Sequence, residues 1–158
     1  MNIEIQPLTV EKFKPYGQVI KPPGKEEPTI SNDDLTYWKQ QAFIKTKGDI
    51  EVGVLKIRKH DMLFSEMEKH LETPEMLIGL DGDFVVPVGP PSEDIPSPDS
   101  IEAFHVKHGQ AIIMDTGCWH GGPKPLDRNE VTLLVIFKDN TSQNDLVLKE
   151  LGETCKMQ

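Results

Sequence analysis

The sequence has few cysteines and no long apolar run. Its 2 cysteines, Cys118 and Cys155, lie far apart and form no metal-binding or redox spacing. No run approaches the ~18 apolar residues of a membrane helix, and the first residues show no basic segment followed by an apolar core. We therefore expect a cytoplasmic protein that has free thiols and does not bind a membrane.

Positive charge is also scarce. The chain has 17 lysines and arginines against 26 aspartates and glutamates, which gives a formal net charge of -9. Nucleic acids and anionic membranes are bound by basic patches, so neither is an expected partner. A small anionic substrate is compatible with this balance only if a local cation or a bound metal holds it.

The length of 158 residues suits one domain with one hydrophobic core. We predict a single domain over residues 1–158. Residues 1–34 are expected to form an N-terminal arm and loop packed on a barrel, with Thr9 capping a short helix. Residues 145–158 are expected to form a short C-terminal helix and tail, because leucines recur there at helical spacing.

Most of the chain between these ends consists of short apolar runs separated by turn residues. Strands are predicted at residues 18–20, 36–38, 42–44, 50–58, 65–71, 76–80, 83–88, 101–106, 111–114 and 131–137. Asp81-Gly82 predicts a hairpin between two of these strands. Many short strands with little helix indicate an all-β sandwich or barrel, and jelly rolls such as cupins are one such group.

The stretch 109–123 is the best candidate for presenting a functional side chain. An apolar run at 111–114 is followed by the turn Asp115-Thr116-Gly117, which delivers Trp119 and His120 before two glycines and a proline. A strand, a tight turn and a polar side chain at its far end are typical of a binding cavity. Cys118 next to His120 has no evident orienting partner, so we interpret it as a buried thiol.

Two stretches resemble the two characteristic motifs of the cupin superfamily. The first motif is matched in spacing by Glu68, His70, Glu75 and Gly82. The second is matched by Gly109, Asp115, Gly117, His120 and Lys124. The resemblance implies a cupin-type double-stranded β-helix, a jelly-roll barrel with short peripheral helices, and one divalent metal held by His70, Glu75 and His120. Two imidazoles with one or two carboxylates suit Mn, Fe, Ni, Co or Zn.

A closer resemblance covers most of the chain. Residues 5–20 are similar to the N-terminal signature of the ureidoglycolate lyase family, and so are Glu68-Lys-His70, residues 84–88 and Cys118-Trp-His120. This resemblance implies a small cytosolic cupin, usually a homodimer, that splits ureidoglycolate into glyoxylate and urea during allantoin (purine) breakdown. The sequence departs from the family at Asp115 and Gly121, where the family has histidines, and at Glu75, where it has glutamine.

The implied reaction is an elimination, for which candidate roles can be assigned. A metal that chelates the substrate carboxylate and hydroxyl would lower the pKa of the hydroxyl, and Asp115 or Glu68 would remove its proton. The remaining candidates are Lys56 or Lys124 as proton donor to the leaving nitrogen, Arg58 as clamp for the carboxylate and Trp119 as a wall of the substrate pocket.

Two alternatives share the predicted fold. One is another metal-dependent cupin enzyme, an isomerase or a dioxygenase, and the other is a metal-free cupin that binds a small molecule.

Overall fold

The computed structural model describes all residues, 1–158, and is almost entirely β. The larger sheet has eight strands in the order β1 (Asn2–Ile3), β15 (Val147–Met157), β7 (Leu63–Lys69), β12 (Trp119–His120), β9 (Phe84–Gly89), β10 (Glu102–Val106) and β2 (Ile5–Pro7), with β13 (Lys124–Pro125) paired to β9. The smaller sheet has five strands in the order β3 (Gly17–Ile20), β11 (Ala111–Met114), β8 (Glu75–Gly79), β14 (Glu130–Lys138) and β6 (Ile50–Arg58).

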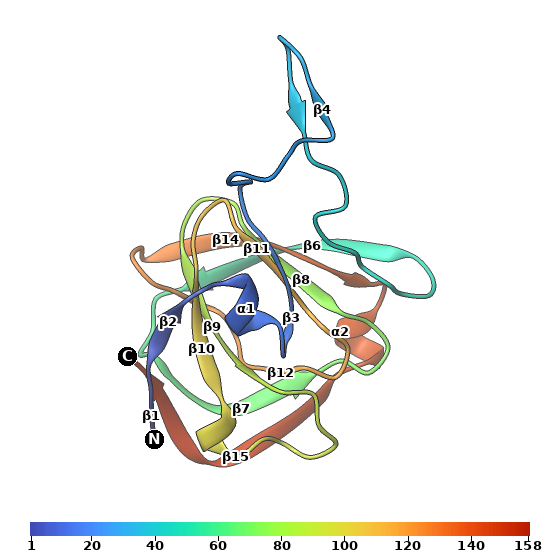
Figure 1. The fold of residues 1–158 in the computed structure, drawn as a ribbon. Coiled ribbons are helices and arrows are strands. Elements are labelled where there is room, and N and C mark those ends of the chain that lie inside the picture. Colours follow the sequence, from blue (N-terminus) through green and yellow to red (C-terminus); the bar gives the residue numbers. More distant parts are fainter.

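Three short helices and a separate hairpin complete the fold. The helices are α1 (Val10–Phe13), α2 (Thr141–Asn144) and the 3-10 turn η1 (Pro98–Ser100). The hairpin consists of β4 (Ile30–Ser31) and β5 (Thr36–Tyr37), and it projects away from the barrel (Figure 1). No helix is long and apolar enough to cross a membrane.

The strand order is that of a jelly roll. Within the smaller sheet β6, β14, β8 and β11 are neighbours, and within the larger sheet β7, β12, β9 and β10 are neighbours, so the chain crosses repeatedly between the two sheets (Figure 1). Eight strands divided in this way between two facing sheets define the double-sheet jelly roll to which cupins belong. The predicted all-β, cupin-type barrel is therefore confirmed.

Apolar side chains on the inner faces of both sheets fill most of the barrel. Phe84, Val86 and Val88 alternate along β9 and pack in one cluster with Leu77 from the facing sheet. A second cluster lies on the other face of the larger sheet and includes Trp119. Because strand β9 is buried on both faces, it contains no polar residue.

Several sequence predictions are confirmed in detail, and three are wrong. Thr9 caps α1, its Oγ1 accepting a hydrogen bond of 3.1 Å from the Lys12 N–H. Residues 42–44 form no strand. Residues 145–151 form no helix, because most of them belong to the long strand β15, whose side chains alternate between half-buried and exposed as it pairs with β7.

The third error concerns Asp81-Gly82. These residues do form a turn, but β8 pairs with β11 and β14 while β9 pairs with β10, β12 and β13. The turn therefore carries the chain from one sheet to the other instead of closing a hairpin. An Asp-Gly turn indicates only that the chain reverses, and the packing of the two sheets decides which strands then pair.

Candidate metal centre

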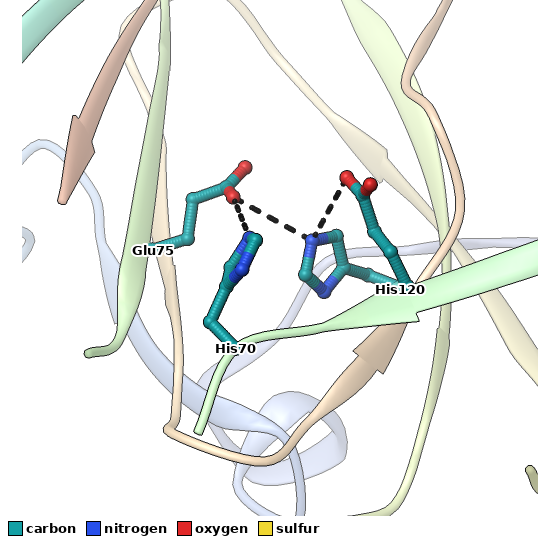
Figure 2. A group of neighbouring side chains, drawn as sticks. His70, Glu75 and His120 are labelled. Atoms are coloured by element: carbon teal, nitrogen blue, oxygen red, sulfur yellow. Dashed lines mark hydrogen bonds and ion pairs between the residues drawn. The ribbon is translucent and has the colours of Figure 1, made fainter. Parts of the chain in front are cut away.

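Four side chains that can bind a metal converge on the inner side of the barrel. Glu68 lies on β7 and His70 directly follows it, Glu75 begins β8, and His120 ends β12. One ligand atom from each lies within 4.8 Å of those from the other three. Figure 2 shows both imidazoles and Glu75 turned toward a common centre. The set unites the predicted ligands His70, Glu75 and His120 with Glu68, which the sequence suggested as a base.

His70 is held by two segments distant in sequence. Its Nδ1 lies 2.6 Å from the carbonyl oxygen of Asp145, and because a carbonyl can only accept, Nδ1 carries the proton. The backbone carbonyl of His70 accepts a 2.7 Å hydrogen bond from the Gly117 N–H, within the turn that follows β11. These contacts leave Nε2 directed at Glu75, whose Oε2 is 2.9 Å away.

His120 is placed by the alternation of side chains along β12. Trp119 points to the outer cluster, so His120 points inward, and both are buried. Its Nδ1 donates to the carbonyl of Cys118 at 3.1 Å. Its Nε2 lies 3.5 Å from both Glu68 Oε1 and Glu75 Oε2, and it forms no hydrogen bond.

The carboxylates and imidazoles strongly shift one another's pKa values. Burial alone would lower the pKa of His120, but the charges of Glu75 and Glu68 outweigh it and raise that pKa to about 10. Burial would raise the pKa of Glu75, but the two histidines bring it down to about 2. The pKa of His70 is also raised, since the hydrogen bonds to Glu75 and to the Asp145 carbonyl overcome the effect of burial.

These four residues fit a divalent metal. The Nδ1–H of each histidine donates to a backbone carbonyl, so each Nε2 faces the carboxylates and is the atom that can bind a metal once its own proton is displaced. Without a cation, the buried His120 Nε2 has no hydrogen-bond partner, since both carboxylate oxygens lie 3.5 Å away, an arrangement that costs free energy. A cation at the centre would satisfy Nε2 and balance the two negative charges, and imidazole with carboxylate suits a transition metal.

The four residues form the polar side of a cavity of about 160 Å³. The remaining lining residues are mostly apolar and come from β6, β14, α2 and the segments that follow β12 and α2. They are Leu55, Val135, Phe137, Pro123, Leu146 and the single hydroxyl residue Ser142. No lysine or arginine lines this cavity.

The structure places the other predicted site residues elsewhere. Lys56 and Arg58 lie on the outer face of β6, where both pair with Glu130, and their side chains are 56% and 65% exposed. They cannot contact a molecule at the centre, because inward positions on β6 are the odd-numbered ones. The structure therefore does not bring Lys56, the predicted proton donor, or Arg58, the predicted clamp, to the metal-binding set.

Asp115, Lys124 and Trp119 are also outside the cavity. Asp115 lines a separate surface hollow with Gln18 and Phe43. Lys124 lines another hollow, beside the first residues of β7. Trp119 is fully buried, and its ring is covered by the ammonium of Lys69 at 4.4 Å. None of the three therefore faces the centre, and Trp119 packs in the outer cluster instead of lining the substrate pocket.

Sequence reasoning missed Asp145 and Ser142. Asp145 carries the carbonyl that fixes the tautomer of His70, and its carboxylate accepts 2.8 Å hydrogen bonds from the N–H groups of Leu71 and Glu72. Nothing in the spacing of these residues links them, since they are about 75 positions apart. Only the pairing of β15 with β7 brings them together.

Comparisons with known proteins identify a family that matches the whole chain. A family model described as ureidoglycolate lyase matches residues 1–158. The ureidoglycolate lyase of Pseudomonas aeruginosa is 25% identical over 148 residues, which cover 90% of this chain and 87% of that protein. The ureidoglycolate lyase of Pseudomonas fluorescens is 26% identical over 139 residues, covering 85% and 83%.

Among solved structures, the chain is similar to the oxalate decarboxylase of Lactobacillus farciminis in its formate complex. The TM-score is 0.46 and the sequence identity 14%, and the match covers 66% of this chain. It spans only 27% of the length of that protein.

Proposed function

Because the chain belongs to the ureidoglycolate lyase family, we propose that it splits ureidoglycolate into glyoxylate and urea. The observation that carries the proposal is the convergence of His70, Glu75, His120 and Glu68 on one cavity. The reaction would take place in the cytoplasm, as a step of allantoin breakdown. The resident metal would be one of Ni, Mn, Fe, Co or Zn, because this set of donors suits all of them.

The cavity composition supports binding of the substrate through its polar end. When bound, a divalent metal supplies a Lewis acid that lowers the pKa of a hydroxyl next to it. His70, Glu75 and His120 would hold that metal, because their side chains are the most buried of the four. The apolar wall excludes water from the opposite side of the substrate. Ser142, which lines the same cavity, would offer one hydrogen bond to the ureido group.

Glu68 is the residue that we assign to proton transfer. Its side chain is 34% exposed, whereas the side chains of Glu75 and His120 are 9% and 3% exposed, so it has more room to move toward a substrate. Asp115, the other predicted base, lines a different hollow. Glu68 would accept the hydroxyl proton of the substrate as a carbonyl forms and the carbon–nitrogen bond breaks.

The same carboxyl would then return the proton to the departing nitrogen. No lysine lines the cavity, so we assign the protonated Glu68 as the acid for the leaving group. The proton moves from oxygen to Glu68 to nitrogen, and the products are glyoxylate and neutral urea. One carboxyl therefore serves as base and acid in turn, which is possible because the reaction transfers one proton overall.

Three variants test the proposal. The assay measures urea release from ureidoglycolate together with the metal content of the purified protein. We expect His120→Gln to lose both metal and activity, and Glu68→Gln to keep the metal while urea release falls by roughly 10²–10⁴-fold, the usual loss for a general acid–base group. His105→Gln is the matched control, because His105 binds Asp83 outside the cavity.

The outcomes separate the alternatives. Metal-loaded protein that releases no urea from ureidoglycolate would refute the lyase assignment. Oxygen consumption without urea release would identify a dioxygenase instead. Loss of metal in Glu68→Gln would show that Glu68 is a required ligand and would remove its assignment as the base.

A further inference from the structure

A hollow of about 460 Å³ outside the metal centre is lined only by polar and charged residues, three of them lysines. Lys45, Thr46 and Lys47 come from the segment that joins the projecting hairpin to β6 (Figure 1). Glu72 follows β7, and Lys138 ends β14. Three lysines against one glutamate leave a local excess of two positive charges, in a chain whose formal net charge is -9. We call this site the lysine hollow.

Two of the three ammonium groups in the lysine hollow have no counter-charge within the chain. Lys45 and Lys47 take part in none of its ion pairs, whereas Lys138 pairs with Glu72. Like charges that gather at one site repel one another, so their convergence costs free energy unless a counter-charge joins them. The chain supplies only the Glu72 carboxylate, whose side chain is 60% exposed.

Thr46 is a second and independent indication of a ligand. Its Oγ1 is buried and forms no hydrogen bond, a property that only one other buried side-chain atom shares, the Nε2 of His120 in the metal centre. Native proteins rarely leave a buried hydroxyl unpaired, because the unpaired group costs free energy. An oxyanion held between the lysines would accept the hydrogen bond that this hydroxyl can donate.

Both walls of the lysine hollow are held in place by hydrogen bonds to the barrel. The side-chain amide of Gln18 donates to the carbonyl of Phe43 at 2.9 Å and accepts from its N–H at 3.1 Å, which fixes the segment that leads to Thr46. On the opposite wall, the Lys138 N–H donates to Thr73 Oγ1 at 3.1 Å. The shape of the hollow therefore does not depend on the lysine side chains.

We propose that the lysine hollow binds a small divalent oxyanion, either a phosphate group or a dicarboxylate. Such an anion balances the local excess of two charges. Its oxygens accept charge-assisted hydrogen bonds from Lys45 and Lys47 and a further hydrogen bond from Thr46. Glu72 competes with the anion for Lys138, because the two already form an ion pair. This site is separate from the metal centre, and the proposal does not rest on the lyase activity.

The test is isothermal titration calorimetry with inorganic phosphate and, separately, with succinate, at constant ionic strength set with sodium chloride. We expect saturable binding of one anion per chain with a dissociation constant of roughly 1 mM or lower. Binding of phosphate alone would identify a phosphate-bearing ligand, and binding of succinate alone would identify a dicarboxylate. Binding of neither anion would overturn the proposal.

A double variant, Lys45→Gln with Lys47→Gln, locates the bound anion. It should weaken binding by roughly tenfold or more, the usual loss when hydrogen bonds to a charged group are removed. Lys14→Gln with Lys25→Gln is the matched control, because it removes the same charge from two exposed lysines that line no hollow. An equal loss in both double variants would show general attraction between charges and would overturn the proposal.

Three single variants separate a binding role from a structural one. Thr46→Val should weaken anion binding without lowering the melting temperature of the anion-free protein, because the hydroxyl has no partner there. Glu72→Gln should strengthen binding, because it removes the competitor for Lys138. His120→Gln should leave anion binding unchanged, because His120 lies in the metal centre. Loss of anion binding in His120→Gln would place the anion on the metal and overturn the proposal.

Labelling with an amine-reactive reagent, read out by mass spectrometry, provides a measurement that needs no variant. The bound anion should protect Lys45 and Lys47 from the reagent and leave Lys14 and Lys25 as reactive as before. Equal reactivity of all four lysines with and without a saturating anion would contradict the proposal. None of these measurements depends on catalysis, so failure here leaves the proposed lyase activity standing.

Discussion

Replacing Asp145 by alanine should destabilise the protein and weaken metal binding together. The carboxylate accepts 2.8 Å hydrogen bonds from the N–H groups of Leu71 and Glu72, in a partly buried loop next to His70. A hydrogen bond to a charged group contributes about 1.5–3 kcal/mol. Two such bonds are lost, and solvent entering the loop offsets part of the loss, so we expect the free energy of unfolding to fall by about 3 kcal/mol.

Denaturant unfolding followed by tryptophan fluorescence measures this change, which corresponds to a fall of about 6–12 °C in melting temperature for a chain of this size. Metal affinity should fall by roughly 10–100-fold, as is usual when the hydrogen-bond partner of a ligating histidine is disturbed. Asp145→Asn keeps one acceptor oxygen and should recover about half of the loss.

Asp94→Ala is the control for removing an aspartate, because the Asp94 side chain is 91% exposed. If the free energy of unfolding of Asp145→Ala lies within about 0.5 kcal/mol of that of the unmodified protein, a difference that is usual for surface substitutions, then Asp145 does not hold the His70 loop.

Three further predictions follow from the same contacts. Because the pKa of His120 in the metal-free protein is about 10, a metal must displace its proton, and metal affinity should therefore rise with pH up to about 10. Calorimetry in buffers of different ionisation enthalpy should detect proton release on metal binding at neutral pH. A metal affinity that does not change with pH would contradict this. Gly17→Ala should destabilise the protein by several kcal/mol in denaturant unfolding, because the added Cβ would lie 1.9 Å from the carbonyl oxygen of Ile113 and the residue has φ +153. Arg58→Ala should change stability by less than about 1 kcal/mol and leave urea release unchanged, because its pair with Glu130 is solvent-exposed; a large loss of activity would restore its predicted role as a clamp.

Short-range patterns in the sequence were sufficient to predict most strands. The alternation along residues 50–58 and the apolar run at residues 131–137 correspond to β6 and β14. The two-residue alternation of side chains in an extended chain also placed Glu68 and His70 on one side, and both side chains do belong to the metal-binding set. The errors arose where a local signal has two outcomes. Leucines in the C-terminal segment suit a helix or a strand, and the open edge of β7 made them a strand.

Strand patterns predicted the all-β class, and the resemblance to the cupin motifs pointed to His70, Glu75 and His120, three of the four residues that converge in the structure. Which charged residues face the cavity was decided by tertiary structure. Lys56 and Arg58 do not line the cavity because the inward positions on β6 belong to their odd-numbered neighbours. Asp115 does not line it because its turn borders another hollow. Asp145 enters the site because β15 pairs with β7. These placements depend on contacts between distant segments, and the sequence pattern within a single strand carries no information about them.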